Sequence, residues 1–167
     1  GGYTRTRLNA GVAVKVGQAT LDGEYIRTGW DYEERQVEKT IEDAFRATVR
    51  FLVGEANVNV NYLAASRDYE GAYTVGLETS GVRAYDVWTR DRDQIGFDVD
   101  LPLSDDGVLA FGGNRAKDDY PGAVEGFAYG YGLQDSTSEA LHAGVTWTRN
   151  AWSLGAWAGF DSYEWNS

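Results

Sequence analysis

The chain has 167 residues, a net charge of −11, 21 glycines, two prolines and no cysteine. The negative charge argues against general nucleic-acid binding, and the lack of cysteine excludes disulfides, thiolate metal sites, a cysteine nucleophile and covalent c-type haem attachment within this sequence. Aromatic residues reach 14%, and together with the many glycines they favour strands joined by polar turns over helices.

Hydropathy gives no sign of a membrane-spanning helix. No segment approaches the roughly 18 consecutive apolar residues that such a helix needs. This test does not detect membrane β-strands, because their apolar residues alternate with polar ones. The sequence has no methionine and no signal peptide, so we expect it to begin after processing or to be an internal segment.

Alternation with a period of two residues predicts eight strands. In chain order they cover residues 8–16, 19–25, 45–51, 56–62, 94–101, 108–115, 141–148 and 152–160. In the third strand, for example, Phe45 and Phe51 share one face while Arg46 and Arg50 share the other. Each strand therefore has one apolar face and one wet face.

Short turns alternate with long polar connections along the chain. We expect the turns at 17–18, 53–55, 102–107 and 149–150, and the long loops near 28–42, 67–92 and 117–138. Short turns at one end of the strands and long loops at the other are typical of outer-membrane barrels. The sequence thus predicts a single all-β unit of four hairpins, an antiparallel transmembrane β-barrel.

Alternation alone leaves open which face meets water. A soluble sandwich turns its apolar face inward, whereas a membrane barrel turns it toward lipid. Small residues mixed with large ones on the apolar faces, and aromatic residues near the strand ends, favour the membrane. Both termini are predicted on the side of the long loops, unlike in complete bacterial barrels. We therefore expect part of a larger barrel.

Three segments of the chain resemble the decahaem-associated outer-membrane barrels of the MtrB/PioB type. They are Val37-Glu38-Lys39-Thr40 with Glu42-Asp43, Arg83-Ala84-Tyr85-Asp86 leading to Arg90-Asp91-Arg92-Asp93, and Lys117-Asp118-Asp119-Tyr120-Pro121 followed by Tyr131-Gly132-Leu133. The chain departs from this pattern at Val87-Trp88-Thr89. It is also much shorter than the family's barrels and lacks the cysteine pair that some members carry.

The resemblance implies a sheath in the bacterial outer membrane. Such a barrel surrounds a periplasmic multihaem c-type cytochrome, contacts outer-membrane lipid and meets an extracellular cytochrome, while holding no haem itself. We expect no enzymatic activity, because no carboxylate pair accompanies a recognisable nucleophile. A general porin, with 67–92 as its constriction loop, and a soluble or surface β-sandwich adhesin remain as alternatives.

The polar strand faces supply the candidates for lining a lumen or contacting a partner. They are Lys15, Asp22, Glu24, Arg46, Arg50, Asn57, Asn59, Asn61, Asp98, Asp100 and His142. We expect the charged ones to pair across strands, and the asparagines fit a hydrated lumen and a solvated face equally well. His142 has no neighbouring cysteine motif and is a poor haem ligand. The run Arg90–Asp93 and the turn at 105–107 lack calcium-loop spacing, so we expect loop ion pairs and no metal.

Overall fold

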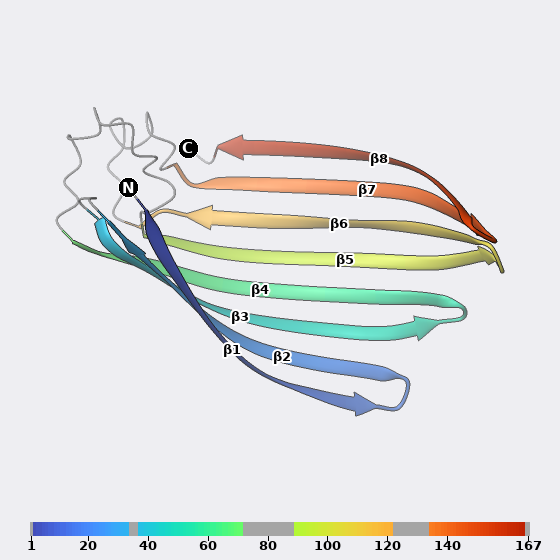
Figure 1. Cartoon of the computed structure of the whole chain (residues 1–167), viewed down its shortest axis with the longest axis horizontal. Helices are drawn as coiled ribbons and strands as arrows, with labels where there is room; N and C mark the ends of the chain where they lie inside the picture. The colour runs from blue at the N-terminus through green and yellow to red at the C-terminus, as the bar shows by residue number, and fades with distance from the viewer. Residues whose placement is uncertain (1, 34–36, 72–88, 122–133, 166–167) are drawn as a thin grey trace.

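The structure, a computed structural model, describes residues 2–33, 37–71, 89–121 and 134–165. These residues form one antiparallel sheet of eight strands, each paired with the next in chain order (Figure 1). The strands are β1 (Tyr3–Val16), β2 (Ala19–Tyr32), β3 (Val37–Val53), β4 (Ala56–Gly71), β5 (Arg90–Ser104), β6 (Gly107–Asp119), β7 (Ser136–Arg149) and β8 (Trp152–Trp165). None of the described residues forms a helix long and apolar enough to cross a bilayer.

Two-residue turns close the four hairpins, at 17–18, 54–55, 105–106 and 150–151. Gly17, Gly54 and Asn150 have φ angles of 62°, 63° and 55°, the left-handed conformation that tight hairpin turns require. The turns predicted at 53–55 and 102–107 are shorter than expected, and the one predicted at 149–150 lies one residue later. All four turns lie at one end of the sheet, opposite β1's start and β8's end (Figure 1).

The strands reach further toward the long connections than the sequence predicts. Residues 28–32 and 37–42, expected in a loop, belong to β2 and β3. The predicted loops 67–92 and 117–138 are shortened in the same way, because β4 ends at Gly71, β5 begins at Arg90, β6 ends at Asp119 and β7 begins at Ser136. The rest of those two loops, 72–88 and 122–133, lies outside the described residues.

The outward face of the sheet is apolar near the short turns and more polar near the long connections. This change explains why the strands were predicted too short. On β3 the outward side chains run from Val53 through Phe51 and Val49 to Phe45, about the nine residues that a tilted membrane strand needs. The next outward residue is Asp43, and the corresponding step on β2 leads from Tyr25 to Arg27. Beyond the apolar band both faces mix polar and apolar residues, so alternation of hydropathy disappears although the strand continues.

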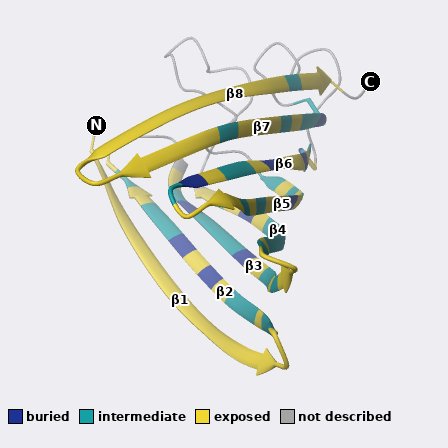
Figure 2. Ribbon diagram, turned by 90° about the vertical axis from the view of Figure 1, so that its right-hand side faces the viewer, coloured by how far each residue is buried: buried dark blue, intermediate teal, exposed yellow. Residues whose placement is uncertain are grey.

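The sheet is curved (Figure 2), and the buried side chains on its polar face identify that face as the concave one. Pairing places the buried side chains Ile26, Thr40, Ala44, Ala116 and Ser136 on the same face as the polar ladders, where curvature crowds neighbouring strands together. Strand β1 is exposed along its whole length. The first and last strands are not paired with each other, so both edges of the sheet are open.

Large apolar side chains cover the convex face without any second layer among the described residues. Val12 is 67% exposed, Leu154 78% and Trp152 83%. A water-soluble sandwich would bury this face against another sheet, and apolar surface of this extent indicates contact with lipid or a partner. The single curved sheet is therefore a barrel wall rather than half of a sandwich.

Candidate functional site

The pairing register places every predicted lumen or partner residue on the concave face. Glu24 lies opposite Arg46, Arg50 opposite Asn59, and Asn59 opposite Asp98. The same rows contain the other candidates, namely Lys15, Asp22, Asn57, Asn61, Asp100 and His142. The structure thus gathers residues from six strands on one surface, and their contact with a partner stays a prediction.

Charged residues of β2 and β3 form a ladder across the concave face. Asp22 and Arg50 approach to 3.0 Å, and Glu24 and Arg46 to 3.6 Å, which confirms the predicted cross-strand pairing. Asn9 Nδ2 donates a 2.7 Å hydrogen bond to Glu24. These partly exposed pairs contribute little to stability, but they hold the side chains along the wall and offset one another's charge.

The asparagine ladder of β4 separates those arginines from two carboxylates on β5. A hollow of about 420 Å³ is lined by Arg50, Asn57, Asn59, Asp98 and Asp100. Amide, guanidinium and carboxylate groups in one open hollow favour water and hydrated solutes over apolar ligands. Among the described residues no three His, Cys, Asp or Glu side chains group as metal ligands would.

His142 and Asp98 approach each other across Gly112, which lies between them on β6. Their side chains are 3.6 Å apart and both are half exposed. A Cβ added at Gly112 would lie 2.6 Å from the carbonyl oxygen of Phe97 and 2.8 Å from His142 Cε1. Glycine therefore permits this approach, and the histidine faces a carboxylate on the concave wall.

A second ion-pair cluster near the long connections was missed by the sequence analysis. Arg92 donates two 2.6 Å hydrogen bonds to Asp118, and Arg90 donates a 2.8 Å hydrogen bond to Glu42. The predicted ion pairing of the Arg90–Asp93 segment is confirmed, but the prediction that it is a loop was wrong, since it begins β5. Extending the parity of Gln94 and Asp98 back to Arg92 and Arg90 would have placed both arginines on the polar face.

Tyr120, the first residue after β6, lies beside this cluster. Tyr120 is buried, and its backbone N–H donates a 2.8 Å hydrogen bond to the Asp135 carboxylate just before β7. Burial, together with the nearby Asp118 carboxylate, raises the pKa of the Tyr120 phenol above its ordinary value. The phenol therefore remains neutral at physiological pH, and it caps the cluster as an uncharged group.

The concave surface of β6, β7 and β8 differs from that of β2 to β5, because small side chains dominate it. They are Ala110, Gly112, Ala116, Ser138, Ala140, Gly144, Gly155 and Gly159. Asn114, His142, Trp157 and Asp161 share this surface, and Trp157 is 85% exposed, so an object inside the curve can approach the backbone closely only between these side chains. The concave face thus has a charged, hydrogen-bonding half and a half in which small side chains surround a few large ones.

An all-antiparallel curved sheet, an apolar convex band and a polar concave face define a bacterial outer-membrane β-barrel. A family model described as "Putative outer membrane beta-barrel porin, MtrB/PioB" matches residues 4–167, so the chain belongs to this family. The resemblance inferred from the sequence is confirmed, and the bacterial outer membrane is the protein's location. No curated protein matches the sequence significantly.

Solved barrels show the same architecture. The outer-membrane expressed OmpT of Vibrio cholerae superposes with a TM-score of 0.70 at 14% identity, over 95% of this chain and 46% of that one. The in-vitro folded, trimeric form of OmpT gives a TM-score of 0.72 at the same identity and coverage. The chain spans about half the length of these barrels, and at such identity the likeness shows the fold alone.

Proposed function

We propose that this segment forms part of a wall that encloses a multihaem c-type cytochrome, which conducts electrons through the outer membrane. The single observation that carries the proposal is the division of the concave face. Its charges are paired with one another on β2 and β3, and most of its side chains along the middle of β6–β8 are small, with Trp157 the largest exception. Membership of the MtrB/PioB family supports the same assignment.

A wall made mostly of small side chains fits a folded protein better than a flow of ions. Protein interfaces pack as densely as protein interiors, so a partner needs surface that it can approach closely. Ala110 and Gly112 on β6, with Ala140 and Gly144 on β7, provide such surface within the curve. Long cationic or anionic side chains in these positions would hold a folded partner away.

The paired charges on β2 and β3 also fit an enclosed cytochrome. The Asp22–Arg50 and Glu24–Arg46 pairs offset each other within the wall, so they produce only a small net field across the lumen. The asparagines Asn57, Asn59 and Asn61 offer donors and acceptors without net charge. Such a lining can hydrogen-bond to a partner's polar surface while adding no strong ionic selectivity.

The haems of such a conduit would belong to the partner. The sequence has no cysteine to attach c-type haem, and His142 lies beside Asp98. In this proposal the chain binds no cofactor and catalyses no reaction. It excludes lipid from the cytochrome and fixes its position, and an extracellular cytochrome would accept or supply electrons at the outer side.

Enclosure requires further strands at both edges of the sheet. The unpaired backbone groups of β1 and β8 would be costly in lipid, where no water satisfies them. Strand β1 runs toward the short turns and β8 runs away from them. An even number of additional antiparallel strands would therefore close the barrel.

One observation favours a second candidate, a porin. Arg50 and the pair Asp98 and Asp100 lie on opposite sides of the asparagine ladder, around the same hollow. Opposed charges across a lumen produce the transverse field by which pores select solutes. The connection expected to supply a constriction lies mostly within 72–88, outside the described residues.

The deciding experiment is to purify the protein from native membranes in mild detergent and to record its haem absorption spectrum. A reducible c-type signal that co-migrates with the chain is expected. Replacing Ala140 with Trp on the concave face should reduce the haem per barrel, while Ala143→Trp, on the convex face of the same strand, should leave it unchanged. A colourless, folded, ion-conducting barrel would refute the sheath and establish the porin.

A further inference from the structure

The convex face carries a groove near the outer limit of the apolar band. It has a volume of about 380 Å³ and crosses β4 to β8. Its floor is the backbone at Gly113, which lies between Phe97 on β5 and Leu141 on β7 in the pairing register. Ile95 and Phe160 complete its apolar walls, so the groove is open on the side where lipid lies.

The groove exists because position 113 has no side chain. A Cβ there would lie 2.5 Å from Leu141 Cδ2 and 2.8 Å from the carbonyl oxygen of Ala140, which real Cβ atoms do not tolerate. Neighbouring outward positions carry large apolar groups, and Phe97, Leu141 and Phe160 are 40%, 57% and 64% exposed. A hollow between exposed apolar walls accommodates a hydrocarbon chain.

Charged side chains close the groove at the end nearer the long connections. Arg115 and Lys117 follow Gly113 on the same outward face of β6. Arg115 Nε lies 3.4 Å from Glu139 and Lys117 Nζ lies 2.8 Å from Asp119, and all four side chains are substantially exposed. The two cations therefore lie at the level where the apolar band ends and lipid headgroups begin.

We propose that this groove binds a phosphorylated, acylated glycolipid of the lipid A class. Long loops of outer-membrane barrels face the exterior, so the cationic end of the groove lies in the outer leaflet, which such glycolipid builds. One acyl chain fills the hollow over Gly113, and a phosphate contacts Arg115 and Lys117. Glu139 and Asp119 keep their cations in place, and together with Asp93, which lies opposite Lys117, they balance the charge of both cations, so the phosphate must compete with these carboxylates.

The test uses the full chain, purified and delipidated in mild detergent, and counts bound lipid by native mass spectrometry. Bisphosphorylated lipid A is expected to bind one saturable site. Dephosphorylated lipid A, and the double variant Arg115→Gln with Lys117→Gln, should each weaken binding by about tenfold or more. Ile95→Trp, which narrows the groove but keeps the charges, should weaken it as well.

Arg27 provides a matched control. It is outward-facing at the edge of the same apolar band, it approaches Asp43 at 3.8 Å, and it lies on β2, away from the groove. Arg27→Gln should leave lipid A affinity unchanged. Equal losses in Arg27→Gln and the double variant, or equal binding of lipid A and phosphatidylethanolamine, would overturn the proposal by showing ordinary lipid contact. Heat-modifiable migration on gels verifies that each variant is folded.

Discussion

Arg92 and Asp118 lie directly opposite each other on β5 and β6 and share two parallel hydrogen bonds of 2.6 Å. The carboxylate is only 12% exposed, and it also lies 3.9 Å from Arg90. A two-pronged contact of this kind fixes the orientation of both side chains as well as their separation. It ties the strands together where they extend beyond the apolar band.

Removing the charge of Asp118 should therefore destabilise the protein. Asp118→Asn leaves two arginines without their shared carboxylate, and we expect a loss of about 2 kcal/mol in the free energy of unfolding. Urea unfolding of the protein in lipid vesicles measures this loss of stability. Asp119→Asn, next along the strand in an exposed pair with Lys117, is the control and should have no measurable effect. Equal losses would show that the paired geometry is unimportant.

Gly112 should resist even the smallest substitution. The added methyl group of Gly112→Ala would meet Phe97, Asp98 and His142 at under 3 Å, so we expect about 1–3 kcal/mol of destabilisation. Gly155→Ala, on the same concave face, would meet its nearest neighbour, Thr146, at 3.6 Å and should be tolerated. Thermal unfolding followed by gel migration compares the two, and a stable Gly112→Ala protein would contradict the close approach.

Adjacent residues of β4 should differ in their tolerance of charge. Val60 lies near the middle of the convex apolar band, so Val60→Arg should cost about 2–4 kcal/mol of folding free energy. Asn59 points to the concave face beside Asp98, and Asn59→Arg should fold normally. Folding yield into vesicles and urea titration measure both. Similar behaviour of the two variants would mean that the two faces are assigned incorrectly.

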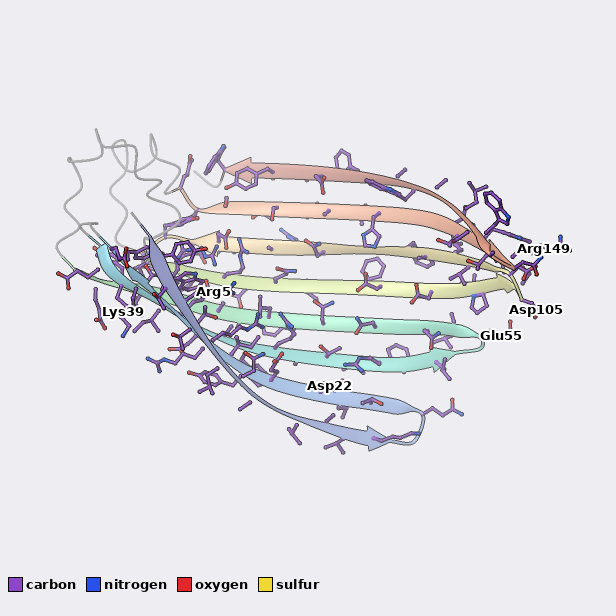
Figure 3. The ribbon with its side chains drawn as sticks, in the orientation of Figure 1. Arg5, Asp22, Lys39, Glu55, Asp105 and Arg149 are labelled. Carbon is purple, nitrogen blue, oxygen red and sulfur yellow. The ribbon has the colours of Figure 1, made fainter. Side chains whose placement is uncertain are left out.

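The absence of cysteine makes the chain suitable for single-cysteine labelling. Lys39 lies at the long-connection end and Glu55 at the short-turn end (Figure 3). A membrane-impermeant maleimide should label Lys39→Cys in intact cells, and Glu55→Cys only after the outer membrane is permeabilised. Val49→Cys, within the apolar band, should stay unlabelled in both cases. Labelling of Glu55→Cys in intact cells would reverse the orientation.

The sequence by itself determined the strands and their two faces. Alternation is a local property, since side chains of successive residues point to opposite sides of any strand. Lys15, Glu24, Arg46, Asn59 and His142 could thus be assigned to one surface before their neighbours were known. Alternation left open which face meets water, and the membrane was indicated by small residues mixed with large ones on the apolar faces and by aromatic residues near the strand ends.

Local pattern failed where both faces of a strand carry polar residues. Residues 28–32 and 37–42 carry polar groups on each side, so nothing in their hydropathy marks them as strand. Hydrogen bonds to neighbouring strands keep them extended, and those pairings join residues far apart in sequence. Glu42, Arg90 and Asp118 come together only because β3 to β6 pair in one fixed register.

Curvature was likewise decided by the tertiary structure. Period two separates the faces of a sheet, but it cannot say which of them is concave, because bending depends on twist accumulated over many strands. The groove over Gly113 is also a product of the tertiary structure. Its walls come from β5, β7 and β8, and a glycine in the sequence predicts a missing side chain without showing what surrounds the space.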